Sequence, residues 1–266
     1  MKIFLSADIE GTAGIAHWDE ADRNHADYRE FRALMTAEVV AACEGARAAG
    51  AEEIVVKDAH DSGRNLILDL LPDYVRIVRG WSGHPDGMMF GLGADFAAAL
   101  YIGYHSKAGT EANPLAHTTT TRVSRLSLNG EVASEFTVNA LCAARYRVPS
   151  AFLAGDAGIC ADARQTVPGI VTVETLEGAG RATVSLAPAR ARMRIRQGVE
   201  AALSRDLLGL APLPAERYEA VVEFCNPSDA YRASWYPGAR FHGPRAVAFA
   251  AADFFDIQRA LRFLLA

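Results

Sequence analysis

The sequence is poor in cysteine and has no paired cysteine motif. Its four cysteines, Cys43, Cys142, Cys160 and Cys225, are widely spaced and form no C-x-x-C element. Such spacing does not indicate a disulfide framework. We expect reduced thiols that pack as small core residues.

Long hydrophobic runs and an excess of basic charge are also lacking. No uninterrupted apolar stretch reaches the length of a membrane span. The first apolar stretch is broken by Asp8 and Glu10, too early for a secretory signal. The formal net charge of −5 argues against nucleic acid as the main partner. We therefore expect a cytoplasmic protein with neither a membrane nor a nucleic-acid partner.

What the chain does have is the composition of a soluble globular enzyme. Of its 266 residues, 50% are hydrophobic and 22% are charged. There are no internal repeats, low-complexity tracts or obvious linkers. The length allows one large domain or two modest ones.

Apolar stretches of strand length alternate with stretches whose apolar residues have helical spacing. The pattern predicts strands over 3–5, 53–58, 97–103 and 150–155, and a long helix over 28–49. Strands that alternate with helices form parallel sheets with right-handed crossovers. We predict an α/β fold with a mainly parallel sheet flanked by helices and a smaller α+β C-terminal part. The expected division is at about residue 180, into 1–180 and 181–266.

Metal-competent side chains follow three of these strands, at the points where the strands end. Asp8 and Glu10 follow the first, His60 follows the second, and His105 follows the third. Parallel sheets bind ligands at the carboxyl ends of their strands, so these groups are expected at one edge. Two neighbouring acids repel each other unless a metal, a basic side chain or water lies between them. The acids alone do not decide among these three.

The candidate ligands form a set with mixed oxygen and nitrogen chemistry: Asp8, Glu10, His60, His105 and Glu135. Two imidazoles and three carboxylates suit zinc, manganese or other borderline metals. Five ligands exceed what one tetrahedral ion needs, and a bridging carboxylate, most naturally Asp8, would let two ions share them. Such a pair activates a water for hydrolysis.

Several of these residues also have ordinary structural interpretations. Glu135 begins a predicted helix and could complement its dipole, and Glu131 is a nearby competitor for its role. Asp58 could orient His60 or cap a loop, and we favour a supporting role over ligation. His117 lies in a threonine-rich segment, where it could act as a base, a nucleophile or an oxyanion donor, or simply bond to a threonine.

These residues occur in motifs that resemble the zinc D-aminopeptidases first associated with a dipeptide-transport operon. The likeness covers nearly the whole chain, with the motifs in order. The motifs are Ser6-x-Asp8-x-Glu10-Gly11, Asp58-x-His60, Gly103-Tyr104-His105, the isolated His117, Glu135-x-x-x-Asn139, Arg32-x-x-Met35-Thr36-x-Glu38 and Glu223-Phe224-x-Asn226.

The resemblance implies an enzyme with two zinc ions that removes N-terminal D-amino acids from short peptides such as D-Ala-D-Ala. It implies that Asp8, Glu10, His60, His105 and Glu135 hold the metals, with Asp8 as the bridge. His117 would be the catalytic side chain that assists attack by a metal-activated water. The resemblance further implies a homodecamer of two stacked pentameric rings.

Other functions fit the same residues less well. An amidase for another small amide would use the same metals with a different pocket. Asp58-x-His60 also suggests a two-metal phosphoesterase, but the sequence has no Gly-Asn-His segment. A dipeptide-binding component would normally carry a signal peptide.

Overall fold

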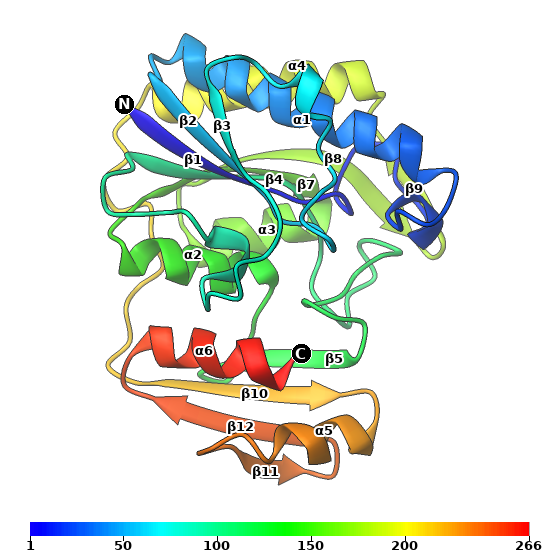
Figure 1. The fold of residues 1–266 in the computed structure, drawn as a ribbon, viewed down its shortest axis with the longest axis vertical. Coiled ribbons are helices and arrows are strands. Elements are labelled where there is room, and N and C mark those ends of the chain that lie inside the picture. The colour runs from blue at the N-terminus through cyan, green and yellow to red at the C-terminus, as the bar shows by residue number, and fades with distance from the viewer. Residues whose placement is uncertain (266) are drawn as a thin grey trace.

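The computed structural model describes residues 1–265, which form two sheets joined by helices (Figure 1). The larger sheet has seven strands, all parallel except for the last pair. In spatial order they are β3 (Val75–Val78), β2 (Glu53–Asp58), β1 (Lys2–Ala7), β4 (Ala98–Tyr104), β7 (Ser150–Asp156), β8 (Val171–Ala179) and β9 (Ala182–Ser185).

Helices cover both faces of the larger sheet. On one face, α1 (Tyr28–Ala48) packs beside α4 (Pro188–Leu203), and on the other lie α2 (Glu135–Arg145) and α3 (Ala157–Thr166) (Figure 1). The central strands are buried on both sides, which explains why they read as nearly continuous apolar runs. Three short 3-10 helices lie in the connections: η1 (Trp18–Glu20), η2 (Leu68–Leu70) and η3 (Gly87–Met89).

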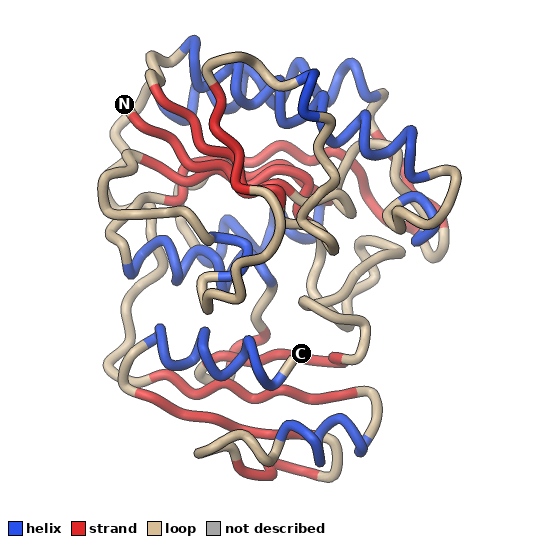
Figure 2. Tube along the Cα trace, viewed as in Figure 1, coloured by secondary structure: helices blue, strands red, loops and turns tan. Residues whose placement is uncertain are grey.

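The smaller sheet is antiparallel and has its own hydrophobic core. Its strands, in spatial order, are β11 (Arg240–Gly243), β12 (Ala246–Ala251), β10 (Tyr218–Phe224), β5 (Val123–Leu128) and β6 (Glu131–Val132). Two helices complete this part, α5 (Pro227–Ala233) and α6 (Phe254–Leu264). Helix α6 lies between α2 and the smaller sheet, and therefore joins the two parts of the molecule (Figure 2).

The expected fold class is confirmed: a mainly parallel sheet with flanking helices, plus a smaller part of strands and helices. The two sheets do not divide the chain at residue 180, however. The hairpin β5–β6 precedes that position and pairs with β10 in the smaller sheet, whereas α4 follows it and packs on α1. Within residues 1–265, no helix is both long and apolar enough to cross a membrane.

Candidate metal centre

The structure brings all six predicted site residues together beside the carboxyl ends of β1, β2 and β4. Asp8 and Glu10 follow β1, His60 follows β2, and His105 follows β4. Glu135 is the first residue of α2, and His117 comes from the long connection between β4 and β5. All are buried except His117, whose side chain is 12% exposed.

The donor atoms fall into overlapping groups, each compact enough to hold one metal ion. One group is Asp8, Glu10 and His60, and a second is Asp8, His105 and Glu135. The only residue common to these two is Asp8: one of its oxygens lies 3.3 Å from His60 Nδ1, and the other lies 3.6 Å from His105 Nε2. Glu10, His105 and His117 form a third group, so His117 is within reach of a ligand position as well.

The hydrogen bonds of the three histidines determine which nitrogen faces the centre. His60 Nε2 lies 2.9 Å from the carbonyl oxygen of Ala21, His105 Nδ1 lies 3.0 Å from that of Ser106, and His117 Nδ1 lies 2.9 Å from that of Leu115. A carbonyl oxygen only accepts hydrogen bonds, so each of these nitrogens is the donor. In the neutral rings, the lone pairs of His60 Nδ1, His105 Nε2 and His117 Nε2 therefore point toward the carboxylates.

This arrangement has the features of a site built for cations. Three carboxylates and three imidazole lone pairs converge, and the buried Oε2 of Glu10 accepts no hydrogen bond from residues 1–265. It lies 3.1 Å from His60 Nδ1, where a shared ion or proton is needed to offset the repulsion between lone pairs. Nitrogen and oxygen donors in this ratio suit zinc.

Comparisons with known proteins agree with this geometry. A family model described as D-aminopeptidase, Peptidase_M55, matches residues 1–263. The chain belongs to this family of D-aminopeptidases. It is 28% identical to a D-aminopeptidase of Bacillus subtilis (strain 168) over 263 residues, 98% of this chain and 95% of the relative.

A solved structure resembles this peptidase over its whole length. It is the Zn-dependent D-aminopeptidase DppA from Bacillus subtilis, described as a self-compartmentalizing protease. The TM-score is 0.94 at 28% identity, covering 100% of this chain and 97% of the other. The family resemblance that the motifs indicated is therefore confirmed, and the chain is a peptidase.

The ionisable groups of the peptidase's centre strongly influence one another's pKa values. Burial and the neighbouring charge of Glu10 raise the pKa of Asp8 well above its ordinary value. Burial also opposes ionisation of Glu10, but the charges of His60 and His105 outweigh it and hold the pKa of Glu10 well below its usual range. For His60, burial lowers the pKa, yet the two facing carboxylates more than compensate and raise it. The positive charge of the two imidazoles thus favours the ionised form of Glu10, as a cation at this position would.

His117 differs from the other two histidines of the peptidase. Burial and the nearby positive charge of His105 lower the pKa of His117, so its ring is neutral near pH 7. Its ring stacks on that of His105, and Trp18 contacts it edge-on with ring centroids 5.2 Å apart. Its unprotonated Nε2 lies 3.9 Å from Glu10 Oε1 and 3.8 Å from Glu135 Oε1.

Close backbone packing positions the two acids that follow β1. The amide of Gly11 donates to the carbonyl of Gly103 at 2.8 Å, and a Cβ on Gly11 would lie 1.8 Å from the carbonyl oxygen of Tyr104. A glycine is thus required because the segment after β1 passes so close to the end of β4, and not because of the turn that follows β1. At Gly103, φ is +71° and a Cβ would lie 2.2 Å from the carbonyl oxygen of Asp8.

A buried polar network holds the same loops from the other side. Asp156, at the end of β7, accepts hydrogen bonds from the amide of Ser106 at 2.6 Å and from the side-chain amide of Asn113 at 3.0 Å. The side-chain amide of Asn113 also donates to the carbonyl of Glu10 at 2.9 Å. Asp156 therefore connects the segment that carries His105 to the one that carries Glu10.

Glu135 is held at the start of α2 by its neighbours. Ser134 caps the helix, and the backbone amide of Thr119 donates to Glu135 Oε1 at 2.6 Å. Thr119 has φ +63°, an unfavourable conformation for a β-branched residue, next to the donor groups. Glu131 lies exposed on β6 and belongs to none of the donor groups found in residues 1–265.

Asp58 caps a loop, which was one of its two expected roles. Its carboxylate accepts hydrogen bonds from the amides of Asn65 at 2.6 Å and Leu66 at 2.8 Å. Asn65 in turn donates to the carbonyl of His60 at 2.7 Å. The ring of His60 is oriented instead by the carbonyl of Ala21, which sequence reasoning missed because every residue carries that group.

The centre lies at the wall of an open cleft of about 600 Å³. Its lining includes Trp18, the 21–24 segment, Trp81, the Thr119–Thr121 segment and Arg262 of α6. No local sequence pattern marked Trp81 or Arg262. Trp81 lies in the irregular connection after β3, and Arg262 belongs to α6, which packs on the smaller sheet.

Proposed function

We propose that this peptidase is a zinc-dependent aminopeptidase that holds two zinc ions and removes D-amino acids from the N-termini of short peptides such as D-Ala-D-Ala. One observation carries the proposal: three imidazoles each donate one N–H to a backbone carbonyl and present the other nitrogen to three buried carboxylates. The family and the zinc dependence named for the Bacillus subtilis protein support it.

The residues would hold the metals in two groups that share Asp8. Glu10 and His60 complete one group with Asp8, and His105 and Glu135 complete the other. The chemistry that bound zinc supplies is a lowered pKa of water and polarisation of the scissile carbonyl. The buried carboxylates of Asp8, Glu10 and Glu135 would offset the positive charge of the metals.

His117 is proposed as the catalytic side chain. Its Nδ1 proton is held by the carbonyl of Leu115, so only Nε2 can exchange a proton with the reacting groups. The lowered pKa of His117 keeps Nε2 ready to accept a proton from the attacking water and to return it to the leaving amine. Stacking on His105 fixes the plane of the ring, so that Nε2 stays near the donor groups.

Assembly and location are part of the proposal. The related Bacillus subtilis enzyme is described as self-compartmentalizing, which supports a closed oligomer, and we propose a homodecamer of two pentameric rings. Analytical ultracentrifugation would give the mass of ten chains of 28.6 kDa each. We also propose that the enzyme acts in the cytoplasm, without a nucleic-acid or membrane partner.

The decisive test of the function compares hydrolysis of several substrates by protein with and without bound zinc. Zinc-loaded protein should hydrolyse D-Ala-D-Ala much faster than L-Ala-L-Ala, lose this activity with a chelator, and regain it when zinc is restored. The proposal would be contradicted by equal rates of hydrolysis of the D- and L-dipeptides, or by rates that the chelator does not change. It would also be contradicted if the protein hydrolysed simple amides or nitrophenyl phosphate but no peptides.

A further inference from the structure

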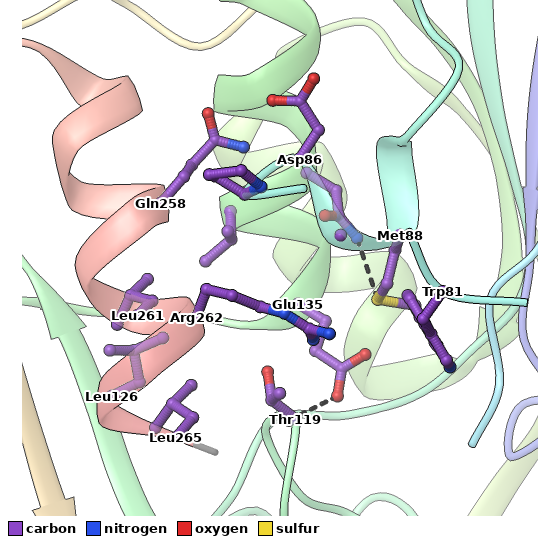
Figure 3. Close-up of a pocket in the computed structure, with 14 residues that line it drawn as sticks. Trp81, Asp86, Met88, Thr119, Leu126, Glu135, Gln258, Leu261, Arg262 and Leu265 are labelled. Atoms are coloured by element: carbon purple, nitrogen blue, oxygen red, sulfur yellow. Dashed lines mark hydrogen bonds between the residues drawn. The ribbon is translucent and has the colours of Figure 1, made fainter. Parts of the chain in front are cut away.

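A second, apolar pocket opens from the metal cleft and has no role in the proposed function so far (Figure 3). Its volume is about 150 Å³. It shares five lining residues with the cleft, so the two spaces are continuous: Trp81, Met88, Thr119, Glu135 and Arg262.

The inner wall of this pocket is made of aliphatic side chains from three elements. Leu126 comes from β5, Val138 from α2, and Leu261 and Leu265 from α6 and the residue after it. Figure 3 shows Leu126, Leu261 and Leu265 on one side, facing Glu135 and Arg262. The pocket therefore lies where the smaller sheet and α6 meet α2, the helix that begins with Glu135.

Three polar side chains that line this pocket, those of Asp86, Gln258 and Asn139, already have partners within the protein. Asp86 is buried, pairs with Arg145 at 3.0 Å and accepts a hydrogen bond from the hydroxyl of Tyr146 at 2.7 Å. Gln258 accepts from Arg145 at 2.9 Å, and the side-chain amide of Asn139 donates to the hydroxyl of Tyr104 at 2.9 Å. Because these three groups are paired, an occupant would gain mainly from burying apolar surface beside them, whereas the exposed Arg262 lines both the pocket and the cleft.

We infer that this apolar pocket receives the side chain of the substrate's N-terminal residue, and that this residue is a large apolar one such as D-leucine or D-phenylalanine. The inference rests on the proposed function. Apolar cavities of about 150 Å³ hold a molecule as large as benzene, so a methyl group would leave most of this pocket unfilled.

The position of Glu135 decides which residue of the substrate enters. Glu135 belongs to a metal-binding group and also lines the pocket, so the pocket begins beside the reacting carbonyl. The side chain of the residue that bears this carbonyl starts two bonds from it, and the side chain of the following residue starts three bonds away. The nearer side chain belongs to the N-terminal residue.

The test compares peptides that differ at one position, with zinc-loaded wild-type protein. One additional methylene in an apolar pocket changes kcat/KM by roughly 10- to 200-fold. We expect kcat/KM for D-Leu-D-Ala and D-Phe-D-Ala to exceed that for D-Ala-D-Ala at least tenfold, and D-Ala-D-Leu to resemble D-Ala-D-Ala. Equal values for all four, or a preference that follows only the second residue, would overturn the assignment.

Two variants examine the pocket wall. V138F fills the pocket and V138I adds a single methylene, so each should lower the ratio of kcat/KM for D-Leu-D-Ala to that for D-Ala-D-Ala, V138F by about tenfold or more. The matched control is V184F, because Val184 is exposed on β9 and lines neither space. An unchanged ratio in folded V138F would overturn the assignment.

A binding measurement separates this inference from the proposed function. Titration of the wild type with the free products should give tighter binding of D-leucine than of D-alanine, and V138F should remove the difference. This result does not depend on turnover. A protein that binds D-leucine preferentially but hydrolyses no peptide would contradict the proposed function alone, and equal binding of the two amino acids would contradict the pocket assignment.

Discussion

The imidazole rings of His105 and His117 lie stacked, with centroids 4.2 Å apart and planes 5° from parallel. The two rings nevertheless have different surroundings. His105 Nε2 faces Asp8 and Glu135 at 3.6 and 3.5 Å, whereas His117 Nε2 lies 3.8 Å or more from Glu10 and Glu135 and borders the cleft. We base on this difference our proposal that His105 is a metal ligand and that His117 exchanges protons.

Replacing His117 with alanine tests that separation. H117A should keep both metal ions and the wild-type fold but lose roughly 100- to 10,000-fold in kcat, the usual contribution of a general base. H105A should lose metal. Metal content by elemental analysis and kcat on D-Ala-D-Ala measure the two effects, and H242A is the control because His242 lies exposed on β11. Loss of a metal ion from H117A would make His117 a ligand.

Replacing Glu10 with glutamine tests one metal position. The Oε2 of Glu10 is buried without a hydrogen-bond donor in the described chain, and a neutral amide there cannot balance the charge of a cation. E10Q should therefore lower metal content and activity together while its circular dichroism spectrum stays native. E131Q changes an exposed acid of the nearby hairpin and should leave both unchanged. A fully metallated, active E10Q would remove Glu10 from the site.

Gly11 tests whether close backbone packing positions the acids. A Cβ at this position would overlap the carbonyl oxygen of Tyr104, so G11A must push the segment after β1 away from the end of β4. Overpacking of this kind costs about 1–3 kcal/mol in the free energy of unfolding. We also expect reduced metal content, because Glu10 is the adjacent residue.

The control for G11A is G243A. A Cβ on Gly243 would make its nearest contact at 3.9 Å, so this substitution should cost nothing measurable. Urea unfolding measures both variants. Equal stability and metal content in G11A and G243A would show that the strand ends tolerate separation.

Glu38 on α1 predicts a pH dependence of stability that is independent of the metal centre. Burial raises the pKa of Glu38 to about 7, although the amide of Ala13 donates to its carboxylate at 2.9 Å and favours ionisation. The folded protein then binds a proton that the unfolded chain releases near pH 4.5. The free energy of unfolding should fall as pH rises from about 4.5 to about 7, by about 3 kcal/mol in total.

The variant E38Q should remove that part of the pH dependence. Urea unfolding at pH 5 and pH 8 should show a steeper loss of stability in the wild type than in E38Q. E30Q serves as the control because Glu30 is exposed on the same helix. If the wild type and E38Q lose the same stability between these pH values, Glu38 is already ionised at pH 5.

The positions of the candidate ligands could be predicted because they follow from local patterns. Each of Asp8, His60 and His105 comes directly after an apolar strand, and a parallel sheet places such strand ends along one edge. The pairing of the hairpin β5–β6 with β10 could not be predicted in the same way. Val222 lies opposite Leu126, and nothing in either local pattern specifies so distant a partner.

The orientation of the histidines was also beyond the sequence. It depends on the backbone carbonyls of Ala21, Ser106 and Leu115. Every residue has such a carbonyl, so the amino-acid type does not indicate which one will bond to a histidine. The apolar pocket was missed for a related reason. Its wall combines Val138 of α2 with Leu261 of α6, two helices that are more than a hundred residues apart in the sequence and contact each other only through the tertiary fold.

Anomalous diffraction at the zinc absorption edge, from crystals of the zinc-loaded protein, tests the central claim most directly. We predict two peaks, both next to Asp8. One should lie beside Glu10 and His60 and the other beside His105 and Glu135. A single peak, or peaks away from these side chains, would contradict the paired metal centre.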